Sequence, residues 1–112
     1  MKQEIYMGLF ERKITVNTAI NIVRTSENAY LIDCREKTEY AAGHVSGAVN
    51  WTIDKMTPDR VTRRFPDKTS IIYVIGNYMQ KPGAVVKKFK KLGYKNAKDG
   101  GYMEEHHGRL VK

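Results

Sequence analysis

The chain has 112 residues, 41% of them hydrophobic, so it is long and apolar enough to fold around one core, as a single domain over residues 1–112. No apolar run approaches the ~20 residues of a membrane span, and residues 1–6 lack the apolar region of a secretory signal. The net charge of +8 predicts anionic or acidic partners, or else a basic protein whose lysines lie on solvated helix faces.

Several segments in the first half of the chain have the apolar pattern of a strand or a helix. We expect strands at residues 5–10, 30–34 and 48–51, and helices at residues 18–24 and 38–42. Asn17 and Thr38 have the side chains that commonly cap a helix N-terminus, and Gly43 is expected to end the second helix. Strands that alternate with helices predict a parallel sheet covered on both faces.

The second half contains the clearest pattern. Residues 71–75 form an apolar run rich in β-branched residues, typical of a strand buried on both faces, and the apolar spacing of residues 83–92 predicts a helix. Gly93 lies where a left-handed residue ends a helix. Beyond it we expect a short strand at residues 94–97, a flexible turn at residues 99–101 and then a tail without periodicity.

The segment between this strand and this helix is the candidate ligand site. In a parallel α/β sheet, ligands bind where a strand ends and the next helix begins. The N-terminus of a helix has free N–H groups and the positive end of the helix dipole, both of which favour an anion. The segment consists of Gly76, Asn77, Tyr78, Met79, Gln80 and Lys81.

Two stretches resemble the first signature of the rhodanese family. Residues 31–36 read Leu-Ile-Asp-Cys-Arg-Glu, and residues 39–50 read Glu-Tyr-Ala-Ala-Gly-His-Val-Ser-Gly-Ala-Val-Asn. They are similar to the family's Asp-x-Arg strand end and its Gly-His-x-x-Gly-Ala-x-Asn block. Residues 92–96 and 100–101 resemble later landmarks in the same order and spacing. The resemblance covers nearly the whole chain. It implies a single rhodanese-like α/β domain, with a central parallel sheet flanked by helices on both faces and an active loop after the fourth strand.

The chain departs from the family's pattern in that loop. In active members the loop opens with a cysteine that carries sulfur as a persulfide, and the resemblance places Gly76 there, which has no nucleophile. Lys81 matches the basic residue that closes the loop. Pro82 removes one N–H donor, and Tyr78 and Met79 are bulkier than the family's usual residues. The resemblance therefore implies a degenerate loop in a non-catalytic module, which binds a small anion, through Lys81, or a protein partner.

The alternative function is a sulfurtransferase that uses Cys34, the only cysteine, as a substitute sulfur carrier. Arg35 would lower the pKa of this thiol. In the opposing interpretation Cys34 is a core residue with a raised pKa, because side chains on a strand stand off the sheet face rather than toward the loop. A lone cysteine also excludes an internal disulfide and a cysteine-based zinc site, and it favours a reducing, cytoplasmic location.

Other polar residues are expected to have structural roles. Asp33 and Arg35 form a predicted ion pair at the strand end, and the resemblance implies that His44 fixes the loop in which it lies. His106 and His107 are adjacent but have no third ligand nearby, so we expect no metal and no cofactor.

Two groups of basic residues suggest further interpretations. A lysine-rich stretch has few interleaved aromatic residues, so we expect a solvated helix face and no nucleic-acid partner. It consists of Lys87, Lys88, Lys90, Lys91, Lys95 and Lys98. A third functional hypothesis is docking of an acidic protein to Arg60, Arg63 and Arg64, which share one face of a helical turn that begins near Pro58.

Overall fold

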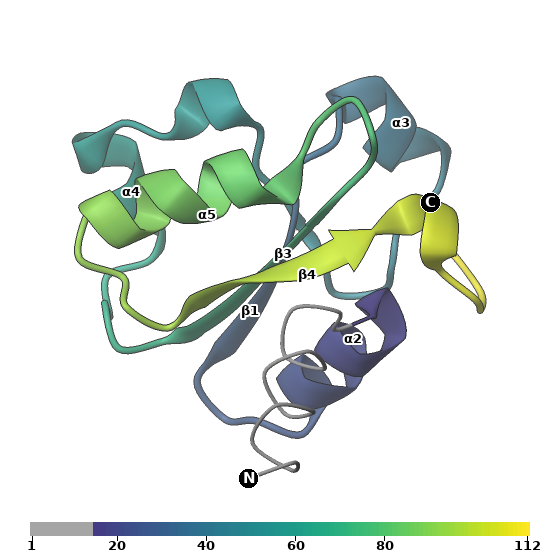
Figure 1. The fold of residues 1–112 in the computed structure, drawn as a ribbon, viewed down its shortest axis with the longest axis horizontal. Coiled ribbons are helices and arrows are strands. Elements are labelled where there is room, and N and C mark those ends of the chain that lie inside the picture. Colours follow the sequence, from purple (N-terminus) through teal and green to yellow (C-terminus); the bar gives the residue numbers. More distant parts are fainter. Residues whose placement is uncertain (1–14) are drawn as a thin grey trace, which may run out of the picture.

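Within residues 15–112, a four-stranded parallel sheet with strand order β2-β1-β3-β4 lies at the centre of the fold (Figure 1). The computed structural model describes residues 15–112, so the strand expected at residues 5–10 lies outside the described residues. The strands are β1 (Ala29–Asp33), β2 (Val49–Asn50), β3 (Ile71–Gly76) and β4 (Ala97–Tyr102). The predicted parallel pairing of the two main strands is confirmed, with Ile32 of β1 opposite Val74 of β3.

Helices cover both faces of this sheet, as predicted (Figure 1). They are α2 (Val16–Arg24), α3 (Lys37–Ala42), α4 (Pro58–Arg64) and α5 (Pro82–Lys91), with the short 3-10 turns η1 (Ile53–Lys55) and η2 (Met103–Glu105). Side chains alternate along β3: Ile72 and Val74 pack with α4 and α5, whereas Tyr73 and Ile75 pack with α2. This alternation explains why β3 reads as a continuous apolar run.

An aromatic cluster joins α4 to α5 and to the sheet. Phe65, at the end of α4, makes edge-to-face contacts with Tyr30, Trp51 and Phe89. The hydroxyl of the buried Tyr94 donates to the carbonyl of Phe65 and lies 3.4 Å from that of Val61. Tyr94 is therefore a buried residue just before the exposed turn that leads into β4, and the expected strand at residues 94–97 begins only at Ala97.

The predicted helix caps are wrong at both N-termini. α2 begins two residues earlier than expected, and the Thr15 hydroxyl accepts a 3.3 Å hydrogen bond from the Thr18 N–H, so Thr15 is the N-cap instead of Asn17. α3 begins before Thr38, with Glu36 at the N-cap position and no side-chain cap bond. Gly43 does end α3, and Gly93 has the predicted left-handed conformation with φ +98°.

The largest difference concerns residues 99–101, which lie within β4 rather than in a flexible turn. Asp99 pairs with Val74 and Gly101 pairs with Ile75, so Gly100 is an extra residue that forms a β-bulge. A Cβ atom at Gly100 would lie 3.0 Å from Ile75 Cγ2 and 3.2 Å from Ala19 Cβ. Glycine is therefore present because the strand backbone packs closely against α2 and β3.

Candidate functional site

The candidate site lies at the carboxyl edge of the sheet, where parallel strands bring their ends together. Residues 77–81 connect β3 to α5. On one side of them, the Cys34 N–H after β1 donates to the Ile75 carbonyl at 2.9 Å. On the other side, Gly76 pairs with Tyr102 at the end of β4. The loop is thus held between the ends of β1 and β4.

Gly76 has no space for a side chain. A Cβ atom built on it would lie 2.2 Å from the carbonyl oxygen of Gln80, and 3.0 Å from both Cys34 Sγ and Pro82 Cδ. The Gln80 carbonyl is held there by a 3.1 Å hydrogen bond from the Asn77 N–H. Gly76 is not among the glycines with positive φ, so glycine is required here by space and not by backbone conformation. The loop is therefore closed over the position where any side chain at residue 76 would begin.

The N–H groups of the loop are already used by side chains of the protein. Asn77 Oδ1 accepts from the N–H groups of Met79, at 3.0 Å, and Gln80, at 2.6 Å. Glu104 Oε2 accepts from the Tyr78 N–H at 3.0 Å. Asn77 is itself buried and donates through Nδ2 to Glu39 Oε2 at 2.9 Å. The three N–H groups that an anion would need are therefore not free.

The charges around the loop are mainly negative. The carboxylates of Glu39 and Glu104 accept hydrogen bonds from the loop. A third carboxylate, that of Glu36, lies 3.5 Å from the side-chain nitrogen of Gln80. Lys81 is exposed and occupies the N-cap position of α5. Three carboxylates and occupied N–H donors weigh against the sequence-based prediction that this loop binds a small anion with Lys81.

Two large apolar side chains point from the loop into solvent. Met79 is 84% exposed and Tyr78 is 55% exposed. The Tyr78 ring makes an edge-to-face contact with Tyr102, with 4.9 Å between ring centroids. This contact and the bond from Glu104 hold the loop against the end of β4, so the exposed pair is presented on an ordered support.

Cys34 is buried, with 2% of its surface exposed, but it contacts the loop as well as the core. Its Sγ lies 3.6 Å from the Gln80 carbonyl oxygen, to which the thiol donates. The prediction that the thiol points away from the loop is therefore wrong. Burial raises the pKa of Cys34 to about 12, the charge of Asp33 adds to this shift, and Arg35 opposes it only weakly. The thiol is protonated at neutral pH, which disfavours it as a nucleophile.

The predicted ion pair between Asp33 and Arg35 is confirmed and is buried. Arg35 Nη2 lies 2.8 Å from Asp33 Oδ2, and Arg35 Nε lies 3.0 Å from Asp33 Oδ1. Arg35 Nη2 also donates to the Gly43 carbonyl at 2.7 Å. These bonds fix the end of β1 to the end of α3, so both side chains are used within the fold.

His44 and Asn50 complete this structural network. His44 Nδ1 lies 2.9 Å from the Tyr40 carbonyl oxygen, and the two rings stack with their centroids 3.7 Å apart. Asn50 Nδ2 donates to the carbonyls of Asp33 and Arg35, both at 3.0 Å. His44 therefore fixes the loop after α3, as the resemblance implied, and the Asn50 contacts explain the last residue of the signature block.

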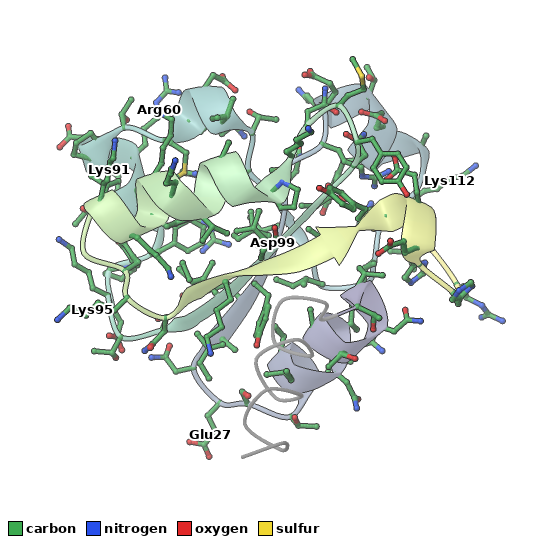
Figure 2. The ribbon with its side chains drawn as sticks, in the orientation of Figure 1. Glu27, Arg60, Lys91, Lys95, Asp99 and Lys112 are labelled. Atoms are coloured by element: carbon green, nitrogen blue, oxygen red, sulfur yellow. The ribbon has the colours of Figure 1, made fainter. Side chains whose placement is uncertain are left out.

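Arg60 of α4, Lys91 at the end of α5 and Lys95 in the turn after α5 lie away from this loop (Figure 2). All six lysines between residues 87 and 98 are exposed, consistent with a solvated face. The expected helix around Arg60 is present as α4. Arg63 lies 3.8 Å from Asp59, and the Arg64 guanidinium lies over the Phe65 ring, 5.1 Å from its centroid. The three arginines thus have different surroundings.

Two residues of the site, Glu39 and Glu104, were missed by sequence reasoning. Glu104 accepts a hydrogen bond from a loop N–H that is 26 residues away in the chain, and it lies in the segment expected to be a tail without periodicity. Glu39 belongs to the signature region, but no local pattern indicates that it accepts from Asn77, 38 residues away. Neither contact has a short-range signal in the sequence.

Within residues 15–112, no group of three or more His, Cys, Asp or Glu side chains is arranged to hold a metal ion. None of the helices there has the length and apolar character that a membrane crossing requires.

Comparison with known proteins supports the resemblance seen in the sequence. Similar folds include a single-domain sulfurtransferase from Saccharomyces cerevisiae, with a TM-score of 0.65, 16% identity, and coverage of 81% of this chain and 84% of that one. A rhodanese-like domain from Anabaena sp. aligns with a TM-score of 0.57 and 23% identity, covering 74% of this chain and 77% of that one. None of the curated proteins matches the chain. The model of the rhodanese-like domain matches residues 15–104, and the chain therefore belongs to the rhodanese-like family.

Proposed function

We propose that this protein is a non-catalytic rhodanese-like domain that binds a protein partner through residues 76–81. The observation that carries the proposal is the 2.2 Å separation between the Gln80 carbonyl oxygen and the Cβ position at Gly76. The family position of the nucleophile is filled by backbone, so this loop has lost both the thiol and the space for it. A loop without a nucleophile can still present a surface.

The chemistry of that surface favours a protein over a small anion. The N–H groups of residues 78–80 are bonded to Asn77 and Glu104, whereas Tyr78 and Met79 are exposed. Aromatic and methionine side chains are enriched at protein interfaces. The carboxylates of Glu36 and Glu39 close to the loop favour a partner segment with lysine or arginine beside an apolar residue. The single buried thiol suits a reducing, cytoplasmic location, which is part of the proposal.

A second candidate function is sulfur transfer through Cys34. It is favoured by one observation: Sγ of Cys34 lies only 3.0 Å from the Cβ position at Gly76, close to where the family's nucleophile begins. A structurally similar protein is a single-domain sulfurtransferase. The raised pKa and burial of the thiol oppose this function, because a protonated thiol is a poor nucleophile.

One enzymatic experiment separates the two candidates. Wild-type protein and Cys34→Ser are assayed for thiosulfate:cyanide sulfurtransferase activity, and their masses are measured after thiosulfate treatment. We expect no turnover above the Cys34→Ser control and no added sulfur on the wild type. A stable adduct of one sulfur on Cys34, lost together with turnover in the variant, would make the protein an enzyme with a relocated nucleophile.

Binding is tested with arrayed peptides that place an apolar residue beside either basic or acidic residues. We expect the wild type to retain basic–apolar peptides and a Tyr78→Ala/Met79→Ala variant to lose them. The matched control is Arg60→Ala/Arg63→Ala, which changes exposed residues on α4. Selection of acidic peptides that depends on the α4 arginines would instead support the acidic-partner hypothesis and contradict the proposed loop surface.

A further inference from the structure

A pocket lies between α2 and the segment after η2, and none of its lining residues belongs to the 76–81 loop. Its volume is about 280 Å³. One wall consists of Asn17, Ile20, Asn21 and Arg24, which are spaced so that they lie along one side of α2. The other lining residues are Val45, His106, His107, Gly108 and Arg109. Because Ile20 and Val45 are buried, the pocket has an apolar floor beneath polar walls.

The walls of this pocket are electropositive. Arg24, Arg109, His106 and His107 all carry or can acquire positive charge, and no lining residue is acidic. The pKa of His106 is lowered, first by its partial burial and then by the positive charges of His107, Arg24 and Arg35. Within residues 15–112, neither Arg24 nor Arg109 forms an ion pair. Positive charge is therefore gathered here without a carboxylate among the described residues to balance it.

We propose that this pocket binds a small multivalent oxyanion of the phosphate or diphosphate type. Guanidinium groups bind phosphate oxygens through paired, charge-assisted hydrogen bonds, and Arg24 and Arg109 supply two such groups from different parts of the fold. The amide groups of Asn17 and Asn21 add neutral donors on the α2 side. The site is independent of the proposed function, because that function rests on the loop at the carboxyl edge of the sheet.

The binding test uses inorganic pyrophosphate as the probe and isothermal titration calorimetry as the measurement. The full chain is compared with Arg24→Gln/Arg109→Gln and with Arg60→Gln/Arg63→Gln, which removes the same charge from α4. We expect the pocket variant to weaken binding by about tenfold or more, because it removes both charge-assisted donors. The α4 variant is expected to change affinity by less than about twofold, because charges on a separate surface are screened by salt.

A second readout follows His106 directly by NMR. Besides its partial burial, the neighbouring groups that lower the pKa of His106 are His107, Arg24 and Arg35. Because a bound oxyanion favours the imidazolium, pyrophosphate should raise the pKa of His106, and affinity should increase as the pH falls through that pKa. Equal loss of binding in both double variants, no binding by the wild type, or an unchanged His106 titration at saturating pyrophosphate would each overturn the proposal.

Discussion

Replacing Gly76 by alanine is the sharpest test of the closed loop. The new Cβ would lie 2.2 Å from the Gln80 carbonyl oxygen, and because that atom belongs to the backbone it cannot rotate away. The turn formed by residues 77–80 must open, which breaks the 3.1 Å hydrogen bond from the Asn77 N–H. Overpacking of this kind destabilises by ~1–3 kcal/mol and a lost hydrogen bond by ~1 kcal/mol, so we expect a total loss of roughly 2–4 kcal/mol.

Urea denaturation of wild type and Gly76→Ala measures this loss as a change in the free energy of unfolding. Gly83→Ala is the matched control, because its Cβ would lie 3.7 Å from Asp99 Oδ2, an ordinary contact, at a helical position in α5. There alanine is favoured over glycine, so the control should be unchanged or stabilised by about 0.5–1 kcal/mol. If Gly76→Ala were as stable as the wild type, the loop could open without lowering the free energy of unfolding, and the main support for a non-catalytic function would be gone.

Three further outcomes are expected. Gly76→Cys should show little thiosulfate:cyanide sulfurtransferase activity, because its side chain would meet the Gln80 carbonyl rather than free N–H groups. Turnover typical of the family would contradict the closed loop. The pKa of Cys34 is raised from 9.0 to about 12, so the stability advantage of the wild type over Cys34→Ala should be constant below about pH 9 and decline toward pH 12. Urea denaturation at each pH measures this difference, and a difference that does not change with pH would refute burial of the neutral thiol. Asp33→Asn should destabilise by ~3–5 kcal/mol in urea, because Arg35 is left buried without its partner, and a loss below 1 kcal/mol would argue that the pair is solvated.

Most of the fold was predictable because its signals are local. β3 is apolar at every position that contacts a helix layer, and the spacing of Val85, Val86 and Phe89 gives α5 its buried face. The strand end Asp33-Cys34-Arg35 and the block that begins at Gly43 are joined by hydrogen bonds between Arg35 and Gly43 and between Asn50 and Arg35. The two parts of the sequence signature are therefore in contact in the fold. These elements depend on neighbours a few residues away or on periodicity, which a sequence displays directly.

The state of the loop was only half predictable. Gly76 and Pro82 predicted an altered loop, but the groups that surround residue 76 depend on contacts between distant segments. Asn77 reads as an ordinary turn residue, yet its amide is placed by Glu39 across the sheet edge. Lys81 suggested an anion, whereas the carboxylates around the loop are contributed by segments far away in the chain. Composition likewise could not indicate that Arg24 and Arg109 line one pocket.

The bulge at Gly100 lets β4 hold one extra residue without losing its pairing beside the loop. Because one extra residue precedes Gly101, the pairing places Tyr102 opposite Gly76, next to the loop that Tyr78 and Glu104 hold. Because Gly100 is unpaired, its deletion would leave Asp99 opposite Val74, Gly101 opposite Ile75 and Tyr102 opposite Gly76 in a regular ladder. A one-residue change in length at the bulge is therefore absorbed within the strand, so relatives that lack this residue should keep the same pairing beside their loop.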